Sequence, residues 1–124
     1  MSMNDLLSDF ITRIRNAKLA GKSTVLVKKN KVVTESVKVL TKLGYFVSYE
    51  EAADGNLSIV LNVSRISDLK RISKPGRRLY FSYRDLPKIR GGIGYNIIST
   101  SKGVITNVEA KQEMVGGELI FQIW

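Results

Sequence analysis

The apolar positions in the first half of the chain alternate between helical and strand spacing. Residues 4–20 and 31–43 carry apolar stripes at helical spacing, while the segments between and after them favour strands. Asp54-Gly55 separates the last two strand-like runs, which is a strong hairpin signal. The predicted elements are, in order, a helix over 4–20, a strand over 23–28, a helix over 31–43 and strands over 46–52 and 57–63. We therefore expect an αβαββ unit with both helices on one face of its sheet.

The second half is richer in Gly, Pro and Ser and reads as mainly β with a short helix. We expect strands over 78–83, Tyr95–Thr100 and 118–124, at most one helical turn over 85–89, a flexible connector at Gly91-Gly92-Ile93-Gly94, and a helix over 107–112 capped by Thr106. The fold class is α+β, with an N-terminal domain over 1–64 and a C-terminal, mainly β recognition domain over 65–124. Neither half would bury much core alone, so we expect the two to pack together.

The charge of the chain is strongly positive and uneven. The 124 residues carry 20 Lys and Arg against 11 Asp and Glu, a net charge of +9. Residues 10–42 hold nine cations and one acid, and residues 65–90 hold nine cations and two acids. A small basic protein most often binds a polyanion, usually nucleic acid. A solvated basic surface without a partner is the alternative.

Several classes of function are excluded or disfavoured by composition. The chain has no Cys and no His, which removes thiolate, imidazole and Cys/His zinc chemistry. Glu50 and Glu51 are adjacent on a predicted strand, so they face opposite ways and cannot form a catalytic dyad. No apolar run approaches the roughly 20 residues of a membrane span, and the first residues lack the pattern of a secretory signal. We expect a cytoplasmic protein that is not an enzyme, with no cofactor, metal, membrane contact or small-molecule substrate.

The start of the second helix breaks a local rule. Asn30 is a good capping residue, but Lys28, Lys29 and Lys31 crowd the positive end of the helix dipole. A phosphate bound at this helix terminus would make the lysines favourable there, because backbone N–H groups and cations would converge on it. Exposed lysines also tolerate this position at little cost, so both interpretations stay open.

The segment Ser99-Thr100-Ser101-Lys102-Gly103 carries the clearest recognition chemistry. Three hydroxyls and an ammonium stand at the end of a strand, and hydroxyls pair with base edges, ribose 2′-OH groups and phosphates. Gly116-Gly117 would let a second backbone segment approach, and Glu118 could accept hydrogen bonds. On spacing alone, an ordinary hairpin turn with Glu118 in a surface ion pair is the favoured interpretation.

An aromatic run, Tyr80, Phe81 and Tyr83, lies beside Arg77, Arg78 and Arg84, as in a base-stacking platform. Strand alternation predicts that Phe81 points opposite to Tyr80. At least one of the two rings is therefore expected in the core.

These segments together resemble the family of the eighth protein of the small ribosomal subunit, bacterial type. The resemblance covers essentially the whole chain. Its most specific part is the run from Gly94 to Thr106, Gly-Tyr-Asn-Ile-Ile-Ser-Thr-Ser-Lys-Gly-Val-Ile-Thr, followed by Gly116-Gly117-Glu118-Leu119. Thr12-Arg13-Ile14-Arg15-Asn16-Ala17 and Ile72-Ser73-Lys74-Pro75-Gly76 add to it. The loop before the second helix departs from the family, which usually has Pro and Ser there.

The resemblance implies two packed α+β domains and primary binding to a helical element in the central domain of small-subunit ribosomal RNA, chiefly by the second half. It implies neighbouring small-subunit ribosomal proteins as partners, in a bacterial or organellar ribosome. Some family members also repress their own messenger RNA, which is the alternative role. The RNA-binding residues it implies are Ser99, Thr100 and Ser101 for specific contacts, Lys102 and Gly103 for the loop, Gly116, Gly117 and Glu118 as a brace, and Arg13, Arg15 and Lys31 for phosphates. Arg77, beside the aromatic run, is a further candidate RNA-binding residue.

Overall fold

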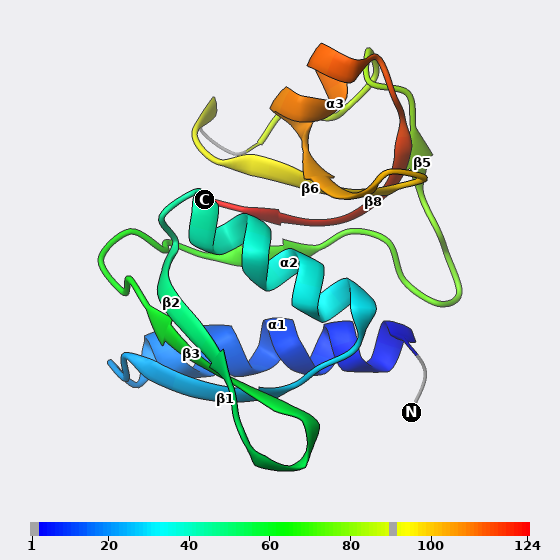
Figure 1. The fold of residues 1–124 in the computed structure, drawn as a ribbon. Coiled ribbons are helices and arrows are strands. Elements are labelled where there is room, and N and C mark those ends of the chain that lie inside the picture. Colours follow the sequence, from blue (N-terminus) through cyan, green and yellow to red (C-terminus); the bar gives the residue numbers. More distant parts are fainter. Residues whose placement is uncertain (1–2, 90–91) are drawn as a thin grey trace. The chain divides into compact units, whose positions relative to one another are not determined.

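The computed structural model describes residues 3–89 and 92–124, with side chains from Leu6 onward. The chain divides into two compact units, Met1–Ser67 and Asp68–Trp124, each built around its own antiparallel sheet (Figure 1). The α+β fold class expected from the sequence is confirmed. The assignment of recognition to residues 65–124 stays a prediction.

The first unit has the expected αβαββ order. Its elements are α1 (Met3–Leu19), β1 (Thr24–Lys28), α2 (Lys31–Lys42), β2 (Phe46–Glu51), the short 3₁₀ turn η1 (Ala53–Gly55) and β3 (Asn56–Leu61). The sheet order is β1-β3-β2. Asp54 and Gly55 both adopt left-handed backbone conformations, with φ of 60° and 70°, as a tight hairpin between β2 and β3 requires. The hairpin prediction is confirmed.

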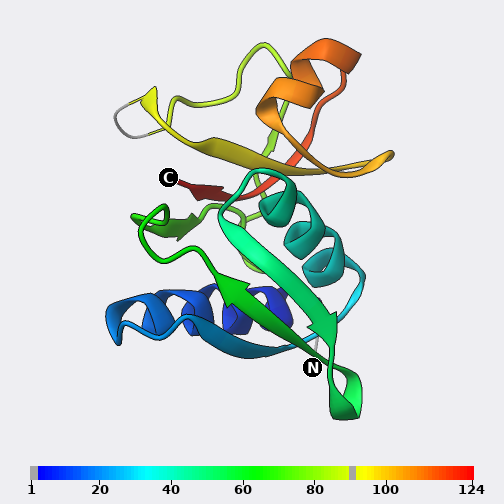
Figure 2. The ribbon, with the colours of Figure 1, turned by 60° about the vertical axis from the view of Figure 1, so that its left-hand side comes forward.

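The core of this unit lies between its sheet and both helices (Figure 2). α1 packs against β1, α2 packs against β2, and the helices contact each other. Leu57, Ile59 and Leu61 of β3 are buried, while the alternating Ser58 and Val60 are only partly covered. The burial of one strand face follows directly from the period-two pattern of the sequence.

The second unit is a five-stranded sheet with one helix. Its elements are β4 (Leu69–Arg71), β5 (Tyr80–Phe81), β6 (Tyr95–Thr100), β7 (Gly103–Thr106), α3 (Asn107–Glu113) and β8 (Gly117–Ile123). The order is β4-β8-β6-β7, and β5 also pairs with β8. α3 contacts β6 and β7, over a core formed by Ile98, Ile105, Ala110 and Leu119. Thr106 caps α3 as expected, since its hydroxyl accepts from Glu109 N at 3.2 Å.

The local expectations for this unit need correction at several places. Two strands were not predicted: β4, which is three residues long and exists through its pairing with β8, and β7, which follows the turn after β6 and pairs back with it. The strand expected over 78–83 is reduced to Tyr80–Phe81, which pair with the first two residues of β8. The helical turn allowed over 85–89 is not formed. Of the expected connector, Gly91 lies outside the described residues, as does the neighbouring Arg90.

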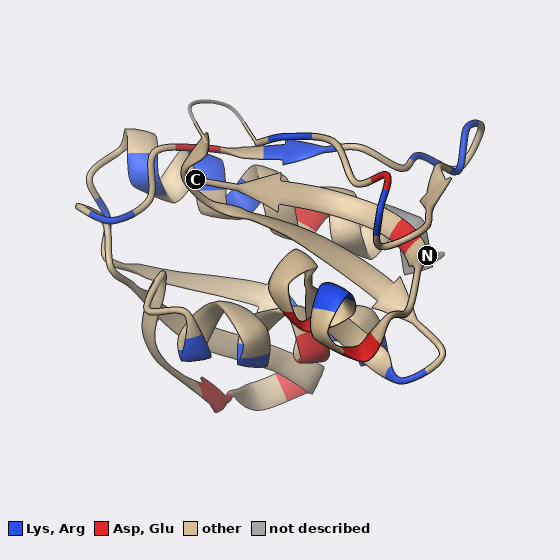
Figure 3. Ribbon diagram, turned by 90° about the horizontal axis from the view of Figure 1, so that it is seen from above, with Lys and Arg blue, Asp and Glu red and all other residues tan. Residues whose placement is uncertain are grey.

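The positive charge avoids the middle of both sheets. The central strands β3, β6 and β8 contain no Lys or Arg, and the cations stand on helices, loops and outer strands (Figure 3). No described helix has the length and apolar character needed to cross a membrane.

Candidate functional site

The hydroxyl-rich segment forms the hairpin between β6 and β7. Thr100 Oγ1 donates to Gly103 O at 2.9 Å and accepts from Lys102 N at 3.1 Å. Gly103 turns the chain with φ of 108°. The hydroxyl proton of Thr100 therefore closes the turn, and only one acceptor position of its oxygen stays available for a ligand.

The hydroxyls on either side of Thr100 differ from it. Ser99 is partly covered and Ser101 is exposed, and neither side chain has a hydrogen-bond partner among the described residues. The exposed Lys102 ammonium stands next to them in the turn. The hairpin thus presents two uncommitted hydroxyls and a cation on a braced backbone.

A row of side chains crosses the sheet beside this hairpin. Ser99 of β6 is the cross-strand partner of Glu118 of β8, and Glu118 is the partner of Tyr80 of β5. Directly opposed residues of antiparallel strands point to the same face, with strands about 4.8 Å apart. Tyr80, Glu118 and Ser99 therefore form one continuous surface, which we call the Ser99–Tyr80 row.

The carboxylate in the middle of the row is held in place. Glu118 Oε2 accepts a hydrogen bond from Ser73 Oγ, and Ser73 is 1% exposed. Ser73 Oγ in turn accepts from Leu79 N at 3.2 Å. Ser73 also opens the tight turn from Lys74 to Arg77, whose backbone groups bond to each other in both directions. Glu118 is thereby tied to the loop that presents the exposed Arg77.

Two glycines permit the close packing around this carboxylate. A Cβ atom on Gly117 would lie 2.2 Å from Ser99 O, and one on Gly116 would lie 2.5 Å from Phe81 O. Real Cβ atoms do not approach backbone oxygens so closely. Glycine at both positions lets the start of β8 fit between β5 and β6, as the sequence suggested.

The aromatic run divides as strand alternation predicts. Tyr80 is 65% exposed, whereas Phe81 and Tyr83 pack against the core of the second unit. The Arg84 guanidinium lies 5.5 Å from the Tyr83 ring centre, and its Nε donates to the Tyr83 hydroxyl at 3.2 Å. Only Tyr80 is thus available as a stacking surface in this run.

The remaining predicted residues belong to the first unit. Arg13 Nε pairs with Asp9 Oδ2 at 2.8 Å, one turn earlier on α1, and this limits its freedom to meet a phosphate. Arg15 on α1 and Lys31 at the start of α2 are exposed. The structure gathers Ser99–Gly103, Gly116–Glu118 and Arg77 in the second unit, and holds Arg13, Arg15 and Lys31 in the first.

The lysine cluster at the start of α2 is partly neutralised. Asn30 caps the helix, with its Oδ1 accepting from Val33 N at 2.9 Å. Lys29 Nζ lies 2.6 Å from Glu51 Oε1. That hydrogen bond, together with the positive charge, lowers the pKa of Glu51 below its ordinary value of 4.5. Glu51 therefore offsets one of the cations that opposed the helix dipole.

Sequence reasoning missed two residues of this site. Ser73 was noticed only as part of a turn motif, because its bond to Glu118 joins positions 45 residues apart. Tyr80 was considered as a platform but not singled out, because its place in the row depends on β5 pairing with β8. Both roles arise from strand register.

Comparison with known proteins assigns the family. The model of the family described as ribosomal protein S8 matches residues 5–124. The chain belongs to the ribosomal protein S8 family. It is therefore a structural ribosomal protein and not an enzyme.

Members of the S8 family from different sources match this chain over its length. The small ribosomal subunit protein uS8 of Ruegeria pomeroyi is 42% identical, covering 98% of this chain and 100% of that protein. The uS8 protein of Pseudomonas fluorescens is 44% identical over 100% of both. The small ribosomal subunit protein uS8c of Gracilaria tenuistipitata var. liui is 43% identical, over 98% of this chain and 99% of its own length.

Proposed function

We propose that this S8-family chain is a component of the small ribosomal subunit and a primary binder of its RNA, at a helical element of the central domain. The named relatives are small ribosomal subunit proteins, which supports the location. The observation that carries RNA binding is the Ser99–Tyr80 row beside a braced hydroxyl turn. Binding a folded RNA element early would make the protein an assembly factor.

The row suits the minor groove of an A-form helix. That groove is wide and shallow, and it exposes 2′-hydroxyls and base edges. Ser99 and Ser101 can donate to or accept from these groups, and the fixed Glu118 carboxylate accepts from 2′-OH or amino donors. Tyr80 offers a ring for an unstacked base at the end of the row.

Cations around the row supply affinity rather than specificity. Lys102 in the turn and Arg77 in the neighbouring loop would meet phosphates, which carry no sequence information. Arg15 and Lys31 of the first unit would add weaker phosphate contacts. Because the Glu118 carboxylate repels phosphates, it favours ligands that bring a hydrogen-bond donor to it.

The test is a titration of the full chain with a fragment carrying the central-domain helix and with a scrambled hairpin of equal length. Ser101→Ala removes a free hydroxyl without altering charge, so binding to the cognate fragment should weaken about tenfold while the scrambled RNA is unaffected. The matched control is Ser48→Ala, at an exposed serine on β2, which should change the affinity for neither RNA. Equal binding of the two RNAs by the unaltered protein would refute specific recognition.

We extend the proposal to the protein's own messenger RNA. A message that folds into the same helical element would offer the row the same groups. Competition between the ribosomal fragment and a leader segment of the message checks this, and Ser101→Ala should weaken both interactions by about the same factor of ten. A leader that binds no better than scrambled RNA would remove the regulatory role and leave the ribosomal one intact.

A further inference from the structure

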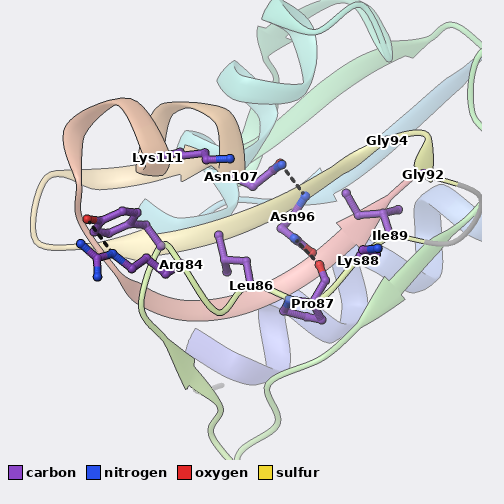
Figure 4. A pocket seen from close by; sticks show the side chains of 11 residues that line it. Arg84, Leu86, Pro87, Lys88, Ile89, Gly92, Gly94, Asn96, Asn107 and Lys111 are labelled. Atoms are coloured by element: carbon purple, nitrogen blue, oxygen red, sulfur yellow. Dashed lines mark hydrogen bonds between the residues drawn. The ribbon is translucent and has the colours of Figure 1, made fainter.

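A second candidate surface lies on the other face of the C-terminal sheet. It is a hollow of about 550 Å³ between α3 and the segment that follows β5 (Figure 4). Asn96 and Ile98 of β6 point to this side, where Ile98 packs with Ala110 of α3, while Ser99 alternates to the opposite face. We call this hollow the α3-side pocket. It shares no lining residue with the Ser99–Tyr80 row.

The pocket contains one fixed amide donor. Asn96 is held by three hydrogen bonds: its N donates to Asn107 Oδ1 at 3.0 Å, its Nδ2 donates to Pro87 O at 2.9 Å and its Oδ1 accepts from Gln122 at 2.8 Å. Because Asn107 accepts through Oδ1, its amide orientation is set, and its Nδ2 has no partner among the described residues. A ligand in the pocket therefore meets a donor that lacks an acceptor.

The charge of the pocket is entirely positive. Arg84, Lys88 and Lys111 line it, and no acid does. Neither Lys88 nor Lys111 forms an ion pair within the described parts of the chain. Lys111 projects from α3, and Lys88 comes from the loop on the other side of the hollow (Figure 4). Two uncommitted ammonium groups thus stand on opposite walls.

The wall between these cations is apolar. Ile89 is buried and Leu86 and Pro87 are partly covered, and all three line the pocket. Such a surface accepts the face of a planar ring, because contact removes apolar area from water on both sides. A ligand that matches the pocket has a flat body, an acceptor on its edge and a negative charge on each side.

We propose that the α3-side pocket binds one unstacked nucleotide of a single-stranded RNA segment. The base would lie on Leu86, Pro87 and Ile89, with an edge acceptor on Asn107 Nδ2. The phosphates on its two sides would meet Lys88 and Lys111. The choice of RNA rests on the proposed function, but the contact is separate from the helical element bound by the Ser99–Tyr80 row.

An extended acidic peptide fits the pocket less well. Peptides that bind beside a sheet gain main-chain hydrogen bonds from a free strand edge. Asn96 of β6 pairs with Gln122 of β8 on one side, and on the other side, beyond the end of the β7 pairing at Ile97, its backbone N donates to Asn107 Oδ1, so that donor is not free to pair with a peptide. A nucleotide needs no such edge, since its charges and its planar base belong to a single unit.

Nuclear magnetic resonance on the isotope-labelled full chain tests the proposal with three probes: uridine 3′,5′-bisphosphate, a four-nucleotide single-stranded RNA and inorganic phosphate. We expect the bisphosphate to shift the Asn107 side-chain amide and the backbone amides of Asn96 and Gly94. The tetranucleotide should shift the same signals with higher affinity. Equal affinity for inorganic phosphate would overturn the proposal, because the pocket would then be a simple anion site.

Variants separate the base contact from general charge. Lys111→Glu on exposed α3 should raise the dissociation constant of the bisphosphate about tenfold or more, whereas Lys38→Glu on α2 makes the same charge change and should alter it less than about twofold. Asn107→Asp keeps the acceptor for Asn96 N, removes the donor and should also weaken binding. Equal effects of Lys111→Glu and Lys38→Glu would reject the pocket.

Two outcomes distinguish failure of this proposal from failure of the proposed function. If the tetranucleotide shifts only the Ser99–Gly103 signals, the pocket is rejected and the row is retained. If Ser101→Ala leaves binding of the helical fragment unchanged while the pocket signals still respond, the Ser99–Gly103 turn is rejected as the source of specificity and the pocket is retained. Tighter binding of an acidic peptide than of the tetranucleotide would reject a nucleotide ligand.

Discussion

At the scale of single residues, the geometry of the Ser99–Tyr80 row depends on a glycine, because no larger residue would fit between β6 and β5. Gly117 has no Cβ, and a methyl group there would lie 2.2 Å from Ser99 O. Gly117→Ala should therefore force β8 away from β6 and cost about 1–3 kcal/mol of stability, the usual range for overpacking. Urea unfolding of the variant measures this cost.

The same substitution has a matched control in the exposed turn after β4. A Cβ on Gly76 would meet nothing within 4 Å, so Gly76→Ala should change stability by no more than about 0.5 kcal/mol. Because Gly117 lies directly between Ser99 and the β5 backbone, its variant should also bind the helical RNA fragment more weakly under conditions where it is folded. Stability equal to that of Gly76→Ala would show that the sheet yields at little cost.

The ion pair of Lys29 and Glu51 makes the stability of the fold depend on pH through a single carboxylate. The hydrogen bond and charge of Lys29 lower the pKa of Glu51, so the folded form holds its proton less tightly than the unfolded chain. The pair stabilises the fold above the unfolded pKa, and this contribution is lost as the pH falls through the lower, folded value. Titration of the Glu51 carboxyl signal should show its pKa rising towards 4.5 in Lys29→Ala. An unchanged pKa would mean that the pair does not persist in solution.

At the scale of elements, the first turn of α2 has a favourable capping residue, Asn30, and nearby lysines whose charge opposes the helix dipole. Asn30 Oδ1 accepts from Val33 N, so Asn30→Ala should destabilise the helix by about 1 kcal/mol. Asn30→Asp keeps the acceptor and adds a negative charge near three lysines and the helix N-terminus, so it should be at least as stable as the natural residue. Hydrogen exchange at the Val33 amide compares the variants. A less stable Asn30→Asp than Asn30→Ala would contradict the capping role.

Elements with strong local patterns were predictable from the sequence. The apolar stripe that runs from Leu7 to Ala17 gives α1, and the alternation at Leu57, Ile59 and Leu61 gives the buried face of β3. Asp54-Gly55 gives the hairpin because both positions need left-handed backbone. In each case the residues that determine the structure are neighbours in the chain.

Elements that depend on distant partners were not predictable in the same way. β4 is three residues long and owes its extended form to pairing with β8 at the end of the chain. β5 ends after Phe81 because β8 begins opposite it, at Gly117. For the same reason the row was only partly visible: Ser99 and Glu118 were noticed as residues, but their alignment with Tyr80 is a matter of register.

At the scale of the whole molecule, a net charge of +9 would attract any RNA, so affinity alone cannot identify the recognition surface. The salt dependence of binding separates the two contributions. Each phosphate neutralised by a cation adds about 0.9 to the slope of log affinity against log salt for a duplex of B-DNA type, and a value of this order applies to helical RNA. Hydrogen bonds to base edges and 2′-hydroxyls add nothing to this slope.

Two variants should therefore change different parameters of one titration series. Arg77→Ala removes a cation from the loop tied to Glu118, so it should reduce the slope by about one and weaken cognate and scrambled RNA alike. Ser101→Ala should leave the slope unchanged and lower affinity for the cognate fragment at every salt concentration. If Ser101→Ala instead lowered the slope, the hydroxyl would be positioning a phosphate contact, and specificity would have to come from Glu118 and Tyr80. The salt series thus assigns the Arg77 guanidinium to the attraction of any RNA and the Ser101 hydroxyl to discrimination between RNAs.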